Sequence, residues 1–212
     1  MKSYLILIIL VLPIFGCVSI PEISRANYAI EAAWQKDLDE LSDKYASRVY
    51  RIPKLKAFRA MRRAMQGLGM VIENRNIKKG VFLATAIAPK PLSDNEWKRV
   101  SEVEEPRMRE IIGKEIGPTT AALFSLKPES YKIIFAAAFV SSKSSTLVTF
   151  KAMMRYIGAI RGAYFPKSPP PTAAQLGLIK IWGAFEKQLE MEGYKIRNIR
   201  GGHRKKILEK PA

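Results

Sequence analysis

The stretch from Tyr131 to Tyr156 places the strongest constraint on the fold, because it predicts a long β-hairpin with two apolar faces. The strands are expected at 131–140 and 146–156, separated by a polar turn at 141–145. Side chains alternate between the two faces of a strand, and both alternating sets of the first strand are apolar. One set is Ile133, Phe135, Ala137 and Phe139, and the other is Ile134, Ala136, Ala138 and Val140. We therefore expect other elements to cover both faces.

A segment nearer the N-terminus predicts a strand, a helix and a second hairpin in succession. A strand at 49–52 precedes Pro53, which favours a helix start, and the helix is expected at 54–68. Gly69 is expected to end this helix in the left-handed conformation. Strands follow at 70–74 and 81–88, joined by a turn at 76–80. The helix has an apolar stripe of Leu55, Phe58, Met61, Met65 and Leu68, and a basic side of Lys54, Lys56, Arg59, Arg62 and Arg63.

Two more helices are indicated by apolar residues that recur at helical spacing. The last helix begins at Thr172, ends near Gly193 and carries Leu176, Ile179, Trp182, Phe185 and Leu189 on one face. An N-terminal amphipathic helix carries Ile23, Ile30, Trp34, Leu38, Leu41 and Tyr45, and it either packs on its own domain or binds another molecule. The predicted fold class is α+β, with an antiparallel sheet packed against two helices and an N-terminal amphipathic helix.

Residues 89–118 interrupt this pattern with four prolines and a charged block. We expect an insertion with two short helices, one capped by residues 93–96 and one at 107–116, followed by a strand at 121–126. A glycosidase-type acid/base pair needs two carboxyl groups held about 5 to 9.5 Å apart across a substrate. Nothing in the insertion fixes such a pair, so its glutamates are expected to be surface groups with lysine and arginine partners.

The first seventeen residues predict export and lipid attachment. Lys2 supplies a positive charge, an apolar run follows at 4–12, and Gly16 precedes Cys17, the only cysteine. The run is shorter than the roughly 20 residues that span a bilayer. The segment resembles a bacterial lipoprotein signal, in which the cysteine becomes acylated and the first residue of the mature chain. The alternative is a free or buried thiol that follows an uncleaved anchor.

The predicted organisation has four parts. A signal peptide at 1–16 is followed by a lipid-anchored tether and amphipathic helix at 17–47. A single α+β periplasmic domain is expected at 48–193, with the proline-rich insertion at 89–118, and a basic flexible tail at 194–212. The cysteine is expected to anchor the mature chain to the outer membrane, because Val18 stands where inner-membrane lipoproteins often carry aspartate.

The chain is strongly basic, with a net charge of +17. Export removes nucleic acid as the usual partner of such a charge, which leaves phospholipid headgroups, lipopolysaccharide and acidic proteins. The tail is expected to contact an anionic membrane surface, and the alternative is that the charge only aids solubility. The tail residues concerned are Lys195, Arg197, Arg200, Arg204, Lys205 and Lys206.

Residue types that serve catalysis are scarce in the predicted domain. Residues 49–193 contain no histidine, no cysteine and one aspartate, Asp94, which removes the usual groups for acid/base, nucleophilic and metal chemistry. The single histidine, His203, lies in the tail without a second metal-ligand residue beside it. Glycine-rich phosphate loops of the GxxxxGK or GxGxxG type are absent as well. We expect a protein that is not an enzyme and has no metal or cofactor.

The segment Ala57–Glu73, followed by Lys79, Gly80 and Val81, resembles the helix-grip domains of BamC-type (NlpB-type) outer-membrane lipoproteins. In that family a helix ending in a leucine-glycine step precedes a hairpin that turns through glycine. The resemblance covers residues 49–88 and 172–193 and implies a helix-grip domain on a lipid anchor. BamC has two such domains and a long unstructured segment that binds its partner lipoprotein, whereas this chain has length for one domain.

The functional expectation is a non-enzymatic outer-membrane lipoprotein that faces the periplasm. It would bind another envelope protein in the assembly or maintenance of the cell envelope. The alternative is a periplasmic carrier that holds a lipid or another apolar ligand between the sheet and the helices. A large lined void between these layers would favour the carrier.

Overall fold

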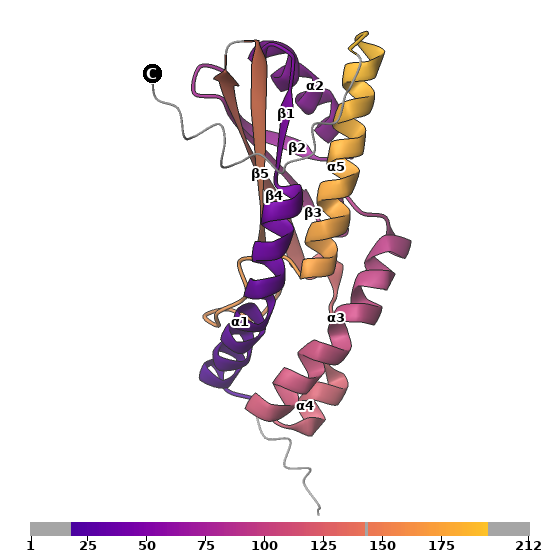
Figure 1. The fold of residues 1–212 in the computed structure, drawn as a ribbon. Helices are drawn as coiled ribbons and strands as arrows, with labels where there is room; N and C mark the ends of the chain where they lie inside the picture. The colour runs from indigo at the N-terminus through magenta and orange to yellow at the C-terminus, as the bar shows by residue number, and fades with distance from the viewer. Residues whose placement is uncertain (1–17, 143, 195–212) are drawn as a thin grey trace, which may run out of the picture.

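The computed structural model describes residues 18–142 and 144–194, which form an α+β fold with one antiparallel sheet (Figure 1). The five strands lie in the order β1-β5-β4-β3-β2. In chain order the elements are α1 (Ile20–Tyr45), β1 (Ser47–Tyr50), α2 (Lys54–Gly67), β2 (Val71–Asn76), β3 (Val81–Ile87), α3 (Asp94–Glu115), α4 (Pro118–Leu123), the 3-10 turn η1 (Pro128–Ser130), β4 (Tyr131–Ser142), β5 (Ser145–Tyr156) and α5 (Pro171–Met191). The predicted fold class, including the N-terminal helix, is confirmed.

The predicted long hairpin is confirmed as β4 and β5, which pair along their whole length. One face of the sheet packs against α2 and α5, and aromatic side chains fill the space between the layers. Phe58 of α2 lies with its ring 5.5 Å from that of Phe82 and 5.3 Å from that of Phe139. Trp182 of α5 lies 4.6 Å from Phe150, measured between ring centroids. These contacts bind the two helices to strands that lie far from them in sequence.

The prediction that both faces of the sheet are covered does not hold within residues 18–142 and 144–194. Along β4 the residues Ile133, Phe135, Ala137 and Phe139 are buried, whereas Ala138 and Val140 on the other face are exposed. Both sets are apolar, so the alternation in sequence does not distinguish the covered face from the open one. The positions of α2 and α5 decide between them.

The predicted helix after Pro53 is confirmed as α2, and Phe58, Met61 and Met65 of the expected stripe are buried, but the buried face is wider than that stripe. Leu55 is 41% exposed, whereas the small residues Ala57, Ala60 and Ala64 are buried. The same holds in α5, where Ile179 is exposed and Leu178 and Ile181 are buried instead. The reason is that α2 and α5 contact each other as well as the sheet, so each helix buries a wider arc than a single apolar stripe.

Residues 94–115 form one helix, α3, where two short helices were expected. Ser93 and Glu96 cap its start reciprocally, as the sequence indicated. The helix continues through Pro106, which removes only one backbone donor. Four residues at four-residue steps, Val100, Glu104, Met108 and Ile112, are buried on both sides of the proline. This continuous buried stripe stabilises the helix across Pro106.

The strand expected at 121–126 is also wrong, because residues Pro118–Leu123 form the short helix α4. Pro118 stands at the first helical turn, where proline is favoured. Helix α4 packs against α3, and a Cβ built on Gly113 would lie 3.6 Å from the Cβ of Ala121. A short apolar run fits either a strand or a helix, and contact with α3 selects the helix.

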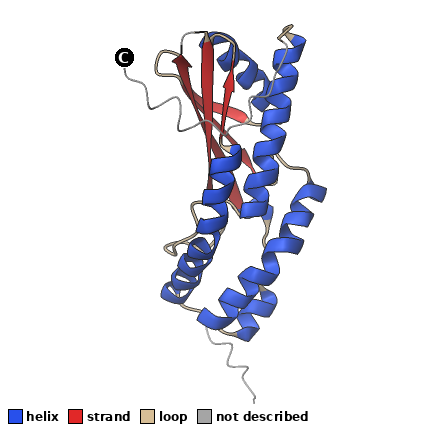
Figure 2. Cartoon of the chain, viewed as in Figure 1, coloured by secondary structure: helices blue, strands red, loops and turns tan. Residues whose placement is uncertain are grey.

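The molecule is elongated, and its two ends differ in structure (Figure 2). The sheet with α2 forms one end, and the first half of α1 lies with α4 and the end of α3 at the other. Arg25 of α1 donates to the side chain of Glu115 at 2.9 Å and to its backbone oxygen at 3.0 Å, which joins α1 to the end of α3. Within residues 18–142 and 144–194, no helix has the length and apolar character needed to cross a membrane.

Candidate functional site

One face of the sheet is left without a covering helix in the described part of the chain. Its side chains come from three adjacent strands, and the register places Ala138 opposite Val81 on one side and opposite Thr149 on the other. Val140 is 57% exposed and Val81 is 44% exposed. The apolar members of this surface, called the open sheet face below, are Val81, Leu83, Ile134, Ala136, Ala138, Val140, Leu147 and Met153.

Charged residues border the open sheet face. Lys132 pairs with Arg155 across β4 and β5, and Lys151 lies opposite Ala136. Lys132 also forms an ion pair with Glu73, which accepts a hydrogen bond from the Thr85 hydroxyl at 2.9 Å. The hydrogen bonds from Lys132 and Thr85 lower the pKa of Glu73 below its ordinary value. The open sheet face is therefore an apolar surface with a mainly basic border.

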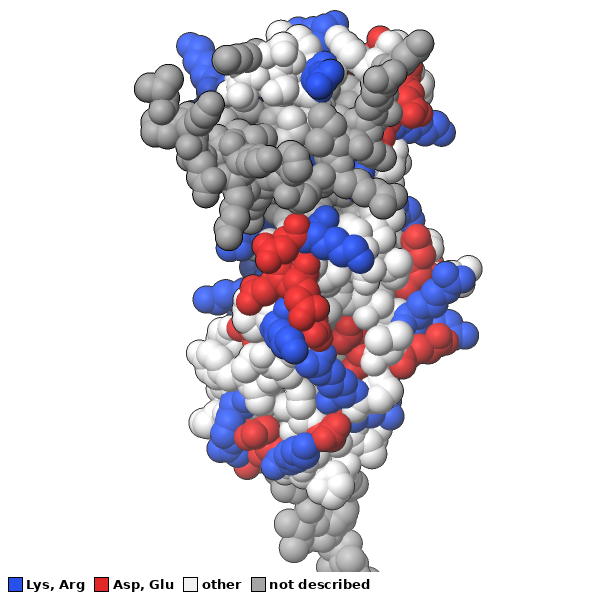
Figure 3. All heavy atoms as spheres, in the orientation of Figure 1, with Lys and Arg blue, Asp and Glu red and all other residues white. Residues whose placement is uncertain are grey.

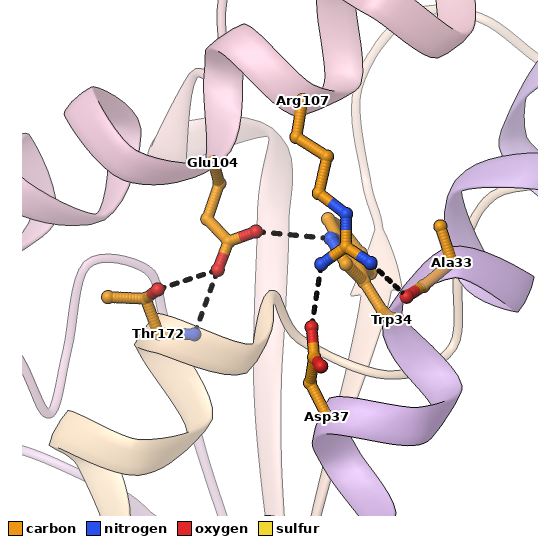
Figure 4. A network of polar contacts seen from close by, with 6 residues as sticks. All are labelled: Ala33, Trp34, Asp37, Glu104, Arg107 and Thr172. Carbon is orange, nitrogen blue, oxygen red and sulfur yellow. Dashed lines mark hydrogen bonds and ion pairs between the residues drawn. The ribbon is translucent and has the colours of Figure 1, made fainter.

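A buried carboxylate joins three helices beside the sheet (Figure 4). Glu104 of α3 is 3% exposed, and one of its oxygens accepts from the Trp34 indole of α1 at 3.1 Å. The other oxygen accepts from the backbone N–H of Thr172 at 2.9 Å and from the Thr172 hydroxyl at 2.7 Å. Thr172 lies in the first turn of α5, where backbone N–H groups lack partners within the helix.

Glu104, Trp34 and Thr172, called the Glu104 cluster below, hold the three helices together. Helix α5 starts after Pro170, which provides no side-chain cap, so Glu104 supplies the missing acceptor from another helix. Arg107, one turn further along α3, donates to the backbone oxygen of Ala33 and to Asp37 of α1, the latter at 2.6 Å. Both oxygens of Glu104 are occupied by neutral donors from the protein, which is the arrangement of a structural carboxylate.

A surface pocket of about 380 Å³ lies beside this cluster, lined by residues of α1, α3 and the start of α5. The carboxylates that line it are already paired or solvent-exposed, and Asp37 is engaged by Arg107. In the part of the chain that the structure describes, no group of three or more histidine, cysteine, aspartate or glutamate side chains is placed to hold a metal ion. We find no geometry in this pocket that assigns it an acid/base or metal-dependent reaction.

Aromatic side chains occupy the space between the sheet and the two covering helices, and a pocket of about 420 Å³ lies between α1, β5 and α5, lined by Leu38, Phe150 and Leu178 among others. Phe82, Trp182 and Phe185 are fully buried, and Phe58 and Phe139 are 2% exposed. A side chain at Gly177 would start 3.3 Å from the Phe135 ring, so even this glycine is in close contact with the sheet. This packing favours binding at an outer surface over carriage of an apolar ligand between the layers.

Charges of both signs alternate over α1 and α3 on the side of the molecule seen in Figure 3. The ion pairs Arg107–Asp37 and Arg25–Glu115 connect these helices to each other. Such interleaved charge is typical of a solvated surface rather than a site for one strongly charged ligand.

The residues predicted from sequence as functional lie outside the described part of the chain. They are Cys17, the lipidation residue, and the tail residues Lys195, Arg197, Arg200, Arg204, Lys205 and Lys206. Sequence reasoning missed Glu104, which was expected to be a surface group. Its four-residue spacing from Val100 and Met108 was the signal that places it on the buried stripe of α3.

Comparisons of this chain with protein-family models, with curated proteins and with solved structures give no match.

Proposed function

We propose that this chain is a non-enzymatic lipoprotein of the bacterial outer membrane that faces the periplasm and binds another protein of the cell envelope. Its role would lie in envelope assembly or maintenance. The observation that carries the binding role is the open sheet face, because contiguous exposed apolar surface on a folded domain is typical of an interaction site. The basic border adds a preference for a partner with acidic groups around an apolar centre.

The lipoprotein part of the proposal is supported by the sequence of residues 1–17 and by the start of the fold. Helix α1 begins at Ile20, three residues after Cys17 in sequence, and Ser19 caps it with Glu22. Three extended residues span about 10 Å. A lipid on Cys17 would therefore hold the α1, α3 and α4 end of the molecule at the membrane surface and leave the sheet further away.

The binding role is tested by photo-cross-linking in intact cells. A photoreactive residue is introduced at Ala138 or Val140 on the open sheet face, and at the exposed Lys56 of α2 as the matched control. We expect one defined envelope protein to cross-link from both sheet positions and not from Lys56. The substitution Ala138→Glu places a charge on the open sheet face and is expected to abolish this product. Equal labelling from the sheet and helix positions would contradict the proposal.

Lipid attachment is tested separately. The wild-type chain is expected to incorporate a fatty-acid analogue and to fractionate with the outer membrane, whereas Cys17→Ser should do neither. A wild-type chain that takes up no label would refute the lipoprotein assignment while leaving the cross-linking result intact. Recovery of labelled protein in the inner membrane would instead contradict the assignment to the outer membrane.

The proposal includes a second membrane contact through the basic tail. Each lysine or arginine close to an anionic surface contributes about 1 kcal/mol before salt screening. Removing residues 194–212 from the Cys17→Ser chain should weaken its sedimentation with anionic vesicles at low salt. If the undeleted chain does not bind anionic vesicles at low salt, the tail has no such role.

A further inference from the structure

We propose that the pocket between α2 and the β2–β3 turn binds a phosphate group. The pocket has a volume of about 460 Å³ and lies at the end of the molecule opposite to the start of α1. Its lining combines Phe58 and Ile77 with four basic residues, Arg59 and Arg62 from α2, and Arg75 and Lys78 from the hairpin. This assignment is independent of the open sheet face and of the lipid anchor.

The four basic side chains of this pocket lack acidic partners within the described residues. Five other arginines of the described residues form ion pairs, and one of them is Arg63, the neighbour of Arg62 on α2, which pairs with Glu192 at 2.8 Å. No ion pair of the described chain includes Arg59, Arg62, Arg75 or Lys78. Like charges gathered from two elements repel each other, and an anion between them removes that repulsion.

Arg62 provides the most direct sign of a missing acceptor. Its Nε is buried and has no hydrogen-bond partner among the described residues. A buried donor without an acceptor is unfavourable, and natural structures seldom leave one. The planar guanidinium group presents its donors in the geometry that phosphate oxygens accept in pairs. A phosphate held by Arg62 and its basic neighbours would offer this guanidinium group acceptors that the described residues do not provide.

The pocket is formed before any ligand arrives, because its walls are fixed by backbone contacts. Asn76 accepts from the backbone N–H of Lys79 at 2.9 Å, and Lys54 donates to the backbone oxygen of Lys78 at 3.2 Å. Gly80 has a φ of 67°, and its oxygen accepts from the Phe139 N–H at 2.8 Å. Since Phe58 packs against the sheet beneath, the basic groups stand around a rigid floor, and the ordering needed on binding is that of their side chains.

Binding is measured with the full-length Cys17→Ser chain at low salt. Binding of pyrophosphate and of inorganic phosphate is measured by calorimetry. Binding to vesicles of phosphatidylglycerol with phosphatidylcholine is measured by sedimentation. We expect Arg62→Gln and Arg75→Gln each to weaken binding by about tenfold, the effect of losing one charge-assisted contact. Arg99→Gln, which removes the same charge from an exposed position on α3, should leave binding within about twofold of wild type.

The results separate the sources of the phosphate. If the pocket substitutions weaken binding of pyrophosphate or phosphate, the ligand is a soluble phosphorylated molecule. If they weaken only the sedimentation with vesicles, the ligand is a lipid headgroup. If Arg62→Gln does not fold, as judged by circular dichroism, Arg75→Gln decides, because Arg75 is exposed on the hairpin. Equal losses in Arg75→Gln and Arg99→Gln, or no binding of any probe by the unsubstituted pocket, would overturn the proposal.

Discussion

Replacing Glu104 with alanine is expected to lower the free energy of unfolding by about 3 to 5 kcal/mol. Glu104 accepts three hydrogen bonds, and the carboxylate links α3 to both α1 and α5. A hydrogen bond to a charged group contributes about 1.5 to 3 kcal/mol, and contributions that share one acceptor are not additive. The Trp34 indole is 1% exposed, so its N–H would be left without an acceptor. Glu104→Gln keeps one oxygen acceptor, and we expect it to cost about half as much.

The measurement is urea unfolding followed by tryptophan fluorescence and circular dichroism. Glu102→Ala, at an exposed position two residues away on the same helix, is the control and should change the free energy of unfolding by less than about 0.5 kcal/mol. An unchanged denaturant slope is needed to compare the variants. If Glu104→Ala were no more destabilising than Glu102→Ala, the cluster would not hold the helices together, and a functional role for Glu104 would have to be reconsidered.

Three further predictions concern the core, a turn and the pH dependence of stability. Trp182→Ala should cost about 3 to 5 kcal/mol in urea unfolding, because Trp182 is fully buried, and a loss below about 1 kcal/mol would refute its place in the core. Gly80→Ala should cost more than about 1 kcal/mol, because its Cβ would lie 2.3 Å from the Phe139 oxygen at a φ of 67°, and wild-type stability would show that the turn adapts freely. Burial, with a smaller contribution from Tyr156, raises the pKa of Tyr131 to about 12, so its folded state favours the neutral phenol. The stability that this provides is complete below about pH 10 and is lost as the pH rises toward 12. The urea midpoint of Tyr131→Phe should therefore fall less over that interval than the midpoint of the wild type. Identical pH profiles of the two midpoints would contradict this prediction.

Elements with strong local signals were predictable from sequence. Pro53 and the glycines after residue 66 bounded α2, and the serine turn at 141–145 separated β4 from β5 within two residues of the observed ends. The N-terminal helix followed from its apolar spacing, and Ala26, Ile30 and Trp34 form its buried face. These predictions succeed because capping, turn chemistry and side-chain alternation act over a few neighbouring residues.

Elements that depend on distant contacts were not predictable. Helix α3 continues through Pro106 because its buried stripe packs on α1, α4 and α5. A prediction from neighbouring residues sees only the proline, which favours a helix end. Helix α4 was expected as a strand, since a short apolar run fits both structures and contact with α3 selects between them. In both cases the deciding interaction comes from another part of the chain.

The candidate sites divide in the same way. The sequence alone determined the basic charge, the scarcity of catalytic residue types, and the lipoprotein-like start at residues 1–17, since each is a property of composition or of adjacent residues. Only the tertiary structure decided which apolar face of β4 is exposed among the described residues, that Glu104 is buried and bonded to Trp34, and that Arg62 and Arg75 share one pocket. The physical reason is that burial and charge clustering depend on which surfaces the folded chain brings together, and these contacts join residues more than ten positions apart in sequence.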